Sequence, residues 1–300
     1  MASKVYDIIT EKIIKALQEG VVPWRNPIIS QQGYNYRHTN GASNRAYTGI
    51  NPLLLDMACH ENGWSSKVWL THKQIEAKHG EILADQKQNH TPVIFWMFPK
   101  DDKEEVDNSV EVKVQKRRPP VLRYYRVWNL QQTTLYVPTA NVPESTKNKA
   151  PNKLEMAEQI IAGYNNPPAI EFGSSRACYI PAKDTVKVPK MTQCTSPENF
   201  YATLFHELIH STGHESRLKR HKADSGIHFG SEEYSREELV AEIGACFLCG
   251  MSNIQGVFDN NVAYIESWIK ALQNDSKMVV VAAAQAQKAA DYILGGNDES

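Results

Sequence analysis

The stretch "YATLFHELIHSTGH", Tyr201–His214, decides how the fold of the C-terminal half is interpreted. It contains the pattern H-E-x-x-H, in which His206 and His210 are four residues apart. On a helix such residues project from one face one turn apart, so both imidazoles can reach the same ion. Glu207, beside the first histidine, can act as general base on a water at that ion. The stretch therefore predicts a metal site with catalytic geometry.

The residues around the motif favour the helix that this geometry requires. Ser196 and Pro197 are typical of an N-cap and a first helical turn. Apolar side chains that can pack against a core recur along the segment, at Phe200, Leu204, Leu208 and Ile209. The motif is therefore expected on an amphipathic helix rather than in a loop.

A third protein ligand is expected from a later helix. A histidine at the metzincin spacing would stand at position 216, which is Ser216, and His214 comes too early, so His214 is expected beside the ion rather than on it. In "REELVAEIGACF", Glu238 and Glu242 lie four residues apart on one face. This resembles the helix of thermolysin-like (gluzincin) peptidases in which one acid binds the metal and the next orients a ligand histidine. Glu238 is the predicted ligand and Glu242 its support, with Glu237 as the alternative ligand.

The predicted cofactor is one divalent ion, zinc first and manganese second. Three protein ligands leave room for a water, whose pKa falls to about 7 on zinc. Glu207 would take its proton during attack on a carbonyl, and the segment 177–189, "ACYIPAKDTVKVP", would bind an extended peptide as an edge strand. Four residues are candidates for stabilising the oxyanion, with nothing to rank them: His214, His221, His228 and Tyr234.

The competing interpretation is that the histidines and the glutamate-rich helix form ordinary solvated faces. Glu242 argues against it, because it lies between the apolar runs "LVA" and "IGACFL". An unpaired carboxylate buried there would cost several kcal/mol, and a metal or a ligand histidine nearby would relieve that cost.

The N-terminal half differs from the C-terminal half in charge and in aromatic content. Residues 1–137 hold 18 Lys+Arg against 14 Asp+Glu, whereas the remainder holds 15 against 20, and all six tryptophans but one lie in the first part. Bases stack on such rings while cationic side chains follow the phosphates, so single-stranded nucleic acid is the predicted partner. The alternative is that many of the rings fill a small core.

Two domains of α+β content are expected. The segment 138–153, "PTANVPESTKNKAPNK", is rich in proline and small polar residues and predicts a linker between domains at 1–137 and 154–300. In the first domain the runs "TPVIFWMFP" and "VLRYYRVWNL" predict two paired strands. In the second, Ser235 is the predicted N-cap of the helix that carries Glu238.

Neither export nor membrane insertion is expected. The first twenty residues lack the unbroken apolar segment of a signal peptide, and the longest apolar run, 278–286, is too short to cross a bilayer. Five cysteines without regular spacing are typical of reduced thiols, and Cys246 and Cys249 are expected in the core. These features favour a cytoplasmic protein.

Both halves of the chain resemble one known family. The runs "PWRNP", "NRAYTGIN", "WLTHKQIEAKHG" and "YYRVWNLQQT" resemble the N-terminal domain of ArdC-type antirestriction proteins, which is also found at the front of plasmid conjugation primases. The runs "TLFHELIHSTGHESRLKR" and "YSREELVAEIGACFL" resemble the zincin-like metallopeptidase domain of the same proteins. The chain departs from the family in the segment 100–120, which is longer than expected.

The resemblance implies an α+β single-stranded-DNA-binding domain followed by a zincin-like (gluzincin-type) metallopeptidase domain. It also implies protection of incoming plasmid DNA from host restriction during conjugation, with restriction machinery or another protein as a conceivable substrate. The competing hypothesis is a protein that shields DNA by occupancy, with a structural or inactive metal site. The DNA-contacting residues expected from the aromatic, basic loops and strands are Trp24, Arg25, Asn44, Arg45, Tyr47, Asn51, Trp69, Lys73, Tyr125 and Trp128.

Overall fold

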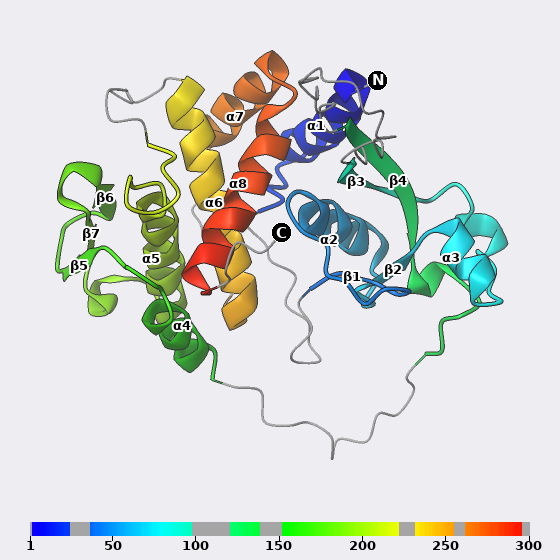
Figure 1. Ribbon diagram of the computed structural model, residues 1–300, viewed down its shortest axis with the longest axis horizontal. Helices are drawn as coiled ribbons and strands as arrows, with labels where there is room; N and C mark the ends of the chain where they lie inside the picture. The colour runs from blue at the N-terminus through cyan, green and yellow to red at the C-terminus, as the bar shows by residue number, and fades with distance from the viewer. Residues whose placement is uncertain are drawn as a thin grey trace, which may run out of the picture.

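The computed structural model describes residues 2–24, 37–97, 121–138, 152–221, 232–254 and 262–295. Their α+β content falls into two parts, as predicted (Figure 1). The first part comprises α1 (Ala2–Gln18), β1 (Thr39–Asn40), α2 (Asn51–Asn62), β2 (Val68–Leu70), α3 (His72–Ala77), β3 (Thr91–Met97) and β4 (Val121–Asn129). The second comprises α4 (Lys153–Ala162), β5 (Ala169–Phe172), β6 (Cys178–Ile180), β7 (Thr185–Val188), α5 (Pro197–Ser211), α6 (Glu232–Ser252), α7 (Val262–Asn274) and α8 (Met278–Ile293).

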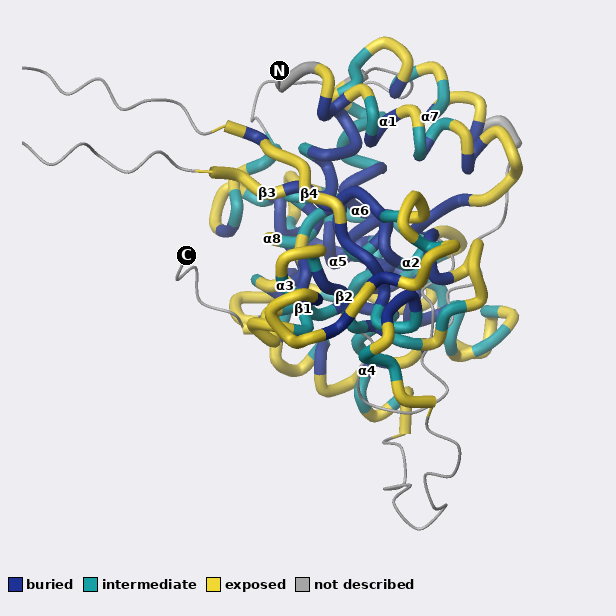
Figure 2. Tube along the Cα trace, turned by 90° about the vertical axis from the view of Figure 1, so that its right-hand side faces the viewer, coloured by how far each residue is buried: buried dark blue, intermediate teal, exposed yellow. Residues whose placement is uncertain are grey.

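The N-terminal sheet has the strand order β1-β2-β4-β3. The predicted pairing of the two aromatic strands is confirmed, because β3 and β4 are antiparallel from Thr91 opposite Val127 to Met97 opposite Val121. Figure 2 shows that these two strands become exposed toward their outer ends. The long segment predicted between them, residues 100–120, lies outside the described residues.

The C-terminal sheet has the order β5-β7-β6, which leaves β6 at an edge. The prediction of one continuous strand over residues 177–189 was wrong, because the segment folds back as antiparallel β6 and β7. Pro181 opens a short 3-10 turn, and Asp184 follows in the left-handed region at φ 45° and ψ 49°. Proline lacks the backbone donor of a ladder, and aspartate tolerates this conformation, so the sequence turns here.

One hydrophobic core runs through both parts of the chain. Buried side chains of α1 and α2 belong to the same cluster as those of the C-terminal helices. Helix α1 packs against α7 and α8, and the fully buried ring of Trp24 meets Trp268 edge to face at 5.3 Å between centroids. The relative position of the two parts is therefore fixed by apolar packing.

Two boundaries bear on the predictions. Of the predicted linker, residues 139–151 lie outside the described residues, and α4 begins at Lys153. The prediction of Ser235 as N-cap was wrong, because α6 begins at Glu232 and Ser235 lies inside it. Glutamates are good formers of a first helical turn, so the helix extends further upstream than the serine suggests.

The described ranges contain no helix with the length and apolar character that crossing a membrane requires. The prediction of core thiols is confirmed for Cys246 and Cys249, which are buried and not disulfide-bonded.

Candidate metal centre

Helix α5 presents His206 and His210 at its C-terminal end. The helix is capped as predicted, since the Ser196 hydroxyl accepts a hydrogen bond from the Asn199 backbone N–H at 3.2 Å. Its apolar stripe, which includes the fully buried Phe205, packs into the core and turns the histidines toward α6.

Close packing of α6 on α5 brings a carboxylate to these histidines. A Cβ atom at Gly244 of α6 would lie 2.7 Å from the Cδ1 atom of Ile209, so glycine is required where the helices cross. One and a half turns earlier on α6, Glu238 reaches both rings.

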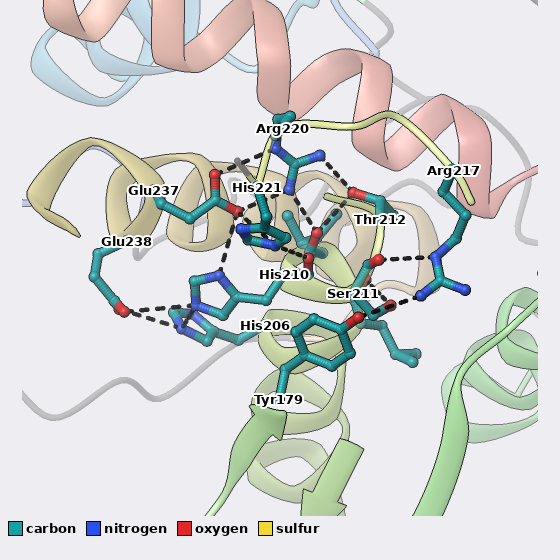
Figure 3. Close-up of polar contacts among 12 residues, drawn as sticks. Tyr179, His206, His210, Ser211, Thr212, Arg217, Arg220, His221, Glu237 and Glu238 are labelled. Carbon is teal, nitrogen blue, oxygen red and sulfur yellow. Dashed lines mark hydrogen bonds and ion pairs between the residues drawn. The ribbon is translucent and has the colours of Figure 1, made fainter. Parts of the chain in front are cut away.

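The three side chains form a group that can hold one ion (Figure 3). The Nε2 atoms of His206 and His210 lie 3.1 Å apart. The Glu238 carboxylate oxygens lie 3.5 Å from Nε2 of His206 and 3.6 Å from Nε2 of His210. Ligands about 2.0–2.1 Å from a tetrahedral zinc ion are about 3.3 Å from one another, so this spacing fits a metal.

Glu237 lies on the other side of the His210 ring from Glu238. Its Oε1 is 3.4 Å from Nδ1 of His210, whereas the ligand-side atom of that ring is Nε2. Arg220 holds this carboxylate from behind, with its Nη2 at 2.8 Å from the same Oε1, and also donates to the Ile209 carbonyl. Glu237 is therefore placed to orient His210 rather than to bind the ion.

The charges at the site favour a bound cation. Burial lowers the pKa of His206, but the carboxylates of Glu238, Glu207 and Glu242 outweigh it and raise that pKa to about 9. Burial likewise raises the pKa of Glu237, but His210 and Arg220 outweigh it and hold the pKa at about 2. A histidine that prefers its charged form among carboxylates marks a place of negative potential.

Two further residues were predicted near the ligands, Glu242 as support for a ligand and His214 beside the ion. Glu242 is buried and contributes negative charge near His206. Glu237 also contacts a ligand histidine, with its Oε1 at 3.4 Å from Nδ1 of His210. His214 bonds to Ser216 through Nδ1 at 2.8 Å and is not among the residues that line the cavity in front of the three clustered side chains.

A cavity of about 430 Å³, the metal-side cavity, opens in front of His206, His210 and Glu238. It is lined by Glu207, by edge strand β6 through Cys178, and by three side chains with hydrogen-bonding groups, Tyr179, His221 and Tyr234. Among the predicted oxyanion candidates the structure thus places His221 and Tyr234 at the cavity, whereas His228 lies outside the described residues. Tyr179 was missed as a single residue, although the segment 177–189 that contains it was predicted to form the peptide-binding edge of the site.

The loop after α5 is anchored by a buried arginine. The Arg217 side chain is fully buried and donates to the Ser211 carbonyl at 2.8 Å and to Asp184 Oδ2 at 3.0 Å. Asp184 also accepts from Tyr179 at 2.8 Å. The arrangement ties the β6–β7 turn to the end of the motif helix, so it fixes one wall of the cavity.

Asp184→Asn is expected to lower the free energy of unfolding by about 2 kcal/mol, less than for a fully buried pair because Asp184 is 30% exposed. Asparagine also tolerates the left-handed backbone conformation at position 184, so the loss of stability measures the effect of removing the charge alone. Burial raises the Asp184 pKa, but Arg217 and Tyr179 outweigh it and leave that pKa below its ordinary value. The contribution is therefore present above about pH 4 and is lost as the pH falls through the folded-state pKa. Urea unfolding from pH 7 to pH 3 checks this, and equal stability of the two proteins at pH 7 would contradict it.

Several of the predicted DNA-contacting residues are core residues. Trp24 and Trp69 are fully buried, and Trp128 and Tyr47 are nearly so. Asn51 is buried and exchanges two hydrogen bonds with the Ile94 backbone, at 2.9 and 2.7 Å. Rings without an exposed face cannot stack on bases, so Trp24 and Trp69 do not serve as a stacking surface in this structure. Arg25 lies outside the described residues.

The remaining predicted contacts border one hollow of the N-terminal part. A cavity of about 350 Å³ is lined by Arg45 and Tyr47, by the exposed Phe95 and Tyr125 of β3 and β4, and by Gln74. Phe95 and Tyr125 meet edge to face at 5.7 Å between centroids. Two further predicted residues, Asn44 and Lys73, are exposed on the turn before α2 and on α3. Phe95 and Gln74 were missed, although alternation in the paired strands could have placed Phe95 near Tyr125.

The comparison with known families covers both parts. Residues 3–128 match the N-terminal domain of anti-restriction factor ArdC, and residues 155–285 match the zincin-like metallopeptidase family.

Relatives that match nearly the whole of this chain were found among curated proteins and solved structures. A DNA primase TraC of Escherichia coli is 34% identical over 300 residues, which are 96% of this chain but 20% of that protein, so the chain spans a small part of its primase relatives. The uncharacterized protein y4eC of Sinorhizobium fredii is 30% identical over 290 residues, which are 96% of this chain and 91% of that protein.

The crystal structure of the antirestriction ArdC protein from plasmid R388 in its metal-free form superimposes with a TM-score of 0.73 at 29% identity, over 97% of both chains. Its Mn(II)-bound form gives a TM-score of 0.71 over 98% of both chains. With both parts matched in order, the chain belongs to the ArdC family of antirestriction proteins.

Proposed function

We propose that the chain binds single-stranded DNA through residues 1–137 and holds one divalent metal ion in a peptidase-type site within residues 154–300. In this proposal it protects incoming plasmid DNA from host restriction during conjugation. The observation that carries the chemistry is the convergence of His206, His210 and Glu238 from two helices, with Glu207 lining the same cavity. Membership of the ArdC family supports the biological setting.

In the metal part, His206, His210 and Glu238 would hold the ion. The ligand set suits zinc, and the Mn(II)-bound form of the R388 relative supports manganese as the alternative. A bound divalent ion would polarise a substrate carbonyl and acidify a bound water.

The chain's own groups supply the rest of the chemistry. Glu207 accepts the proton of the attacking water, and the edge of β6 binds an extended peptide through its backbone. Tyr234, whose hydroxyl hydrogen-bonds Glu238, can turn to donate to a substrate oxygen once Glu238 binds the ion, whereas the Nε2–H of His221 is already donated to the His210 carbonyl at 2.8 Å.

In the DNA part, the hollow between the Asn40–Arg45 turn and the β3–β4 sheet combines the required groups. Phe95 is 46% exposed and Tyr125 is 38% exposed, so bases can stack on these rings. Arg45 is exposed at the same hollow and can follow the phosphates. The Gln74 amide oxygen already accepts from Asn40 Nδ2 and from the Thr71 N–H, and its Nε2 donates to Asn40 Oδ1, which leaves one N–H of Gln74 for a base edge.

Tyr125→Ala is expected to weaken single-stranded DNA binding about tenfold, because stacking contributes about 1–3 kcal/mol for each base. The matched control is Tyr124→Ala, since Tyr124 is 39% exposed on the same strand and points to the opposite face. Fluorescence anisotropy with a labelled oligonucleotide at two salt concentrations measures both. Equal losses for the two variants, or no loss for Tyr125→Ala, would show that this face does not bind DNA.

A further inference from the structure

A third cavity, of about 290 Å³, lies between the two parts of the chain. One wall is α2 with the loop before it, and the other is formed by α6 and α8, which lie beside α2 in Figure 1. Apolar lining comes from Leu53, Phe247 and Leu294. The volume is at the lower end of the range of small-ligand sites. None of the lining residues belongs to the metal-side cavity.

A buried polar network stands behind the N-terminal wall. Asp56 Oδ1 accepts from His38 Nε2 at 2.8 Å and from Lys67 Nζ at 2.5 Å. The other ring nitrogen of His38 accepts from Trp69 Nε1 at 2.8 Å, which fixes the Nε2–H tautomer. Burial lowers the pKa of His38 and outweighs the opposite effect of Asp56, so His38 is neutral. Within the described residues the two donors to Asp56, His38 and Lys67, both bond to its Oδ1, which leaves Oδ2 of Asp56 for a ligand.

The C-terminal wall adds groups of the same kind. Asp291 of α8 lines the cavity and accepts from Gln287 Nε2 at 2.9 Å. Gln287 in turn accepts from the Gly49 backbone N–H at 3.3 Å, which ties the loop before α2 to α8. Arg37 completes the polar lining.

The balance of charge selects the kind of ligand. Lys67 pairs with Asp56, and the lining holds one further formal charge of each sign, on Arg37 and on Asp291, so the cavity has no formal excess of either sign for an ionic ligand. Asp56 of α2 and Asp291 of α8 offer carboxylate oxygens from the two walls, and Leu53, Phe247 and Leu294 add apolar lining. A neutral, flat heterocycle with an amino group matches this combination.

The cavity adjoins the proposed DNA surface. Ala46 and Tyr47 line both the interdomain cavity and the hollow that contains Tyr125. A strand lying in that hollow would therefore run beside the wall that the two cavities share.

We propose that the interdomain cavity binds one unstacked nucleobase that carries an exocyclic amino group, from a strand held on the N-terminal hollow. This inference rests on the proposed single-stranded DNA binding and extends it to base preference. Carboxylates accept hydrogen bonds from such amino groups, as aspartate does from N4 of cytosine, and thymine has none to offer. The protein is therefore expected to prefer strands that offer at least one such base.

The test compares the full chain bound to a labelled twelve-nucleotide oligo-dT and to the same strand with one central dC. Sliding lets the protein place that base in the cavity, so the dC strand is expected to bind about tenfold tighter. Leu294→Trp fills the cavity from the end of α8, and Asp291→Ala removes an exposed acceptor without disturbing the core. Both variants should bring the ratio of the two affinities to within twofold of one, while oligo-dT affinity persists.

The matched control is Lys288→Ala, exposed on α8 and absent from the cavity wall, which should keep the tenfold ratio. A ratio near one in the unaltered protein, or a ratio that survives in both cavity variants, overturns the nucleobase site and leaves DNA binding standing. Failure of the unaltered protein to bind either strand overturns the proposed DNA function and the nucleobase site with it.

Discussion

Glu238→Ala is expected to abolish metal binding at the α5–α6 site. The two histidines would remain 3.1 Å apart, but the carboxylate that closes the triangle at 3.5 and 3.6 Å would be lost. Removing a hydrogen-bond partner of a ligand costs about 10- to 100-fold in metal affinity, and removing the ligand itself is expected to cost more. Competition titrations with Zn(II) and Mn(II) against a chromophoric chelator measure the loss and rank the two metals.

Glu237→Gln tests whether Glu237 supports a ligand histidine while Glu238 is the ligand itself. It removes the charge held between Arg220 and Nδ1 of His210, so a loss of about 10- to 100-fold is expected, smaller than for Glu238→Ala. Circular dichroism confirms that each variant is folded. If Glu237→Gln cost more than Glu238→Ala, the assignment of ligand and supporting residue would have to be exchanged.

Glu207→Gln is expected to slow metal-dependent peptide hydrolysis by about 10²- to 10⁴-fold, the usual contribution of a positioned general base. Glutamine keeps the shape of a side chain that is buried at the cavity wall, and Glu207 is not one of the three clustered donors. Metal affinity and single-stranded DNA affinity should therefore stay close to those of the unaltered protein. A quenched peptide library with the metal-loaded protein measures the rate.

The same variant distinguishes hydrolysis from shielding. If Glu207→Gln protected DNA from restriction as well as the unaltered protein, occupancy of the DNA would be the mechanism and the metal site would serve another purpose. Loss of protection with retained DNA affinity would assign the effect to hydrolysis.

The clustering of His206, His210 and Glu238 could be predicted from sequence, because most of its geometry is local. The spacing of His206 and His210 is a property of one helix, and Glu238 follows from the pattern of the next. The role of Glu237 is not local, because it depends on how α6 is rotated against α5 where Gly244 meets Ile209. Arg220 belongs to a loop whose path the motif does not specify.

The exposure of the aromatic side chains was predicted less well, because composition does not distinguish an exposed ring from one that fills a core. Trp24 lies in an aromatic, basic stretch of the sequence, yet it packs on Trp268 of α7 across the boundary between the two parts. That contact depends on the shared core, which a division at residues 138–153 does not anticipate. The alternation of β3 and β4 was visible, and it separates Tyr125 from Tyr124 correctly.

The most direct test is anomalous diffraction from crystals of this protein soaked with Mn(II). The account predicts one peak within coordination distance of Nε2 of His206, Nε2 of His210 and the Glu238 carboxylate. A peak at Glu237, or no peak beside the two histidines, would contradict it.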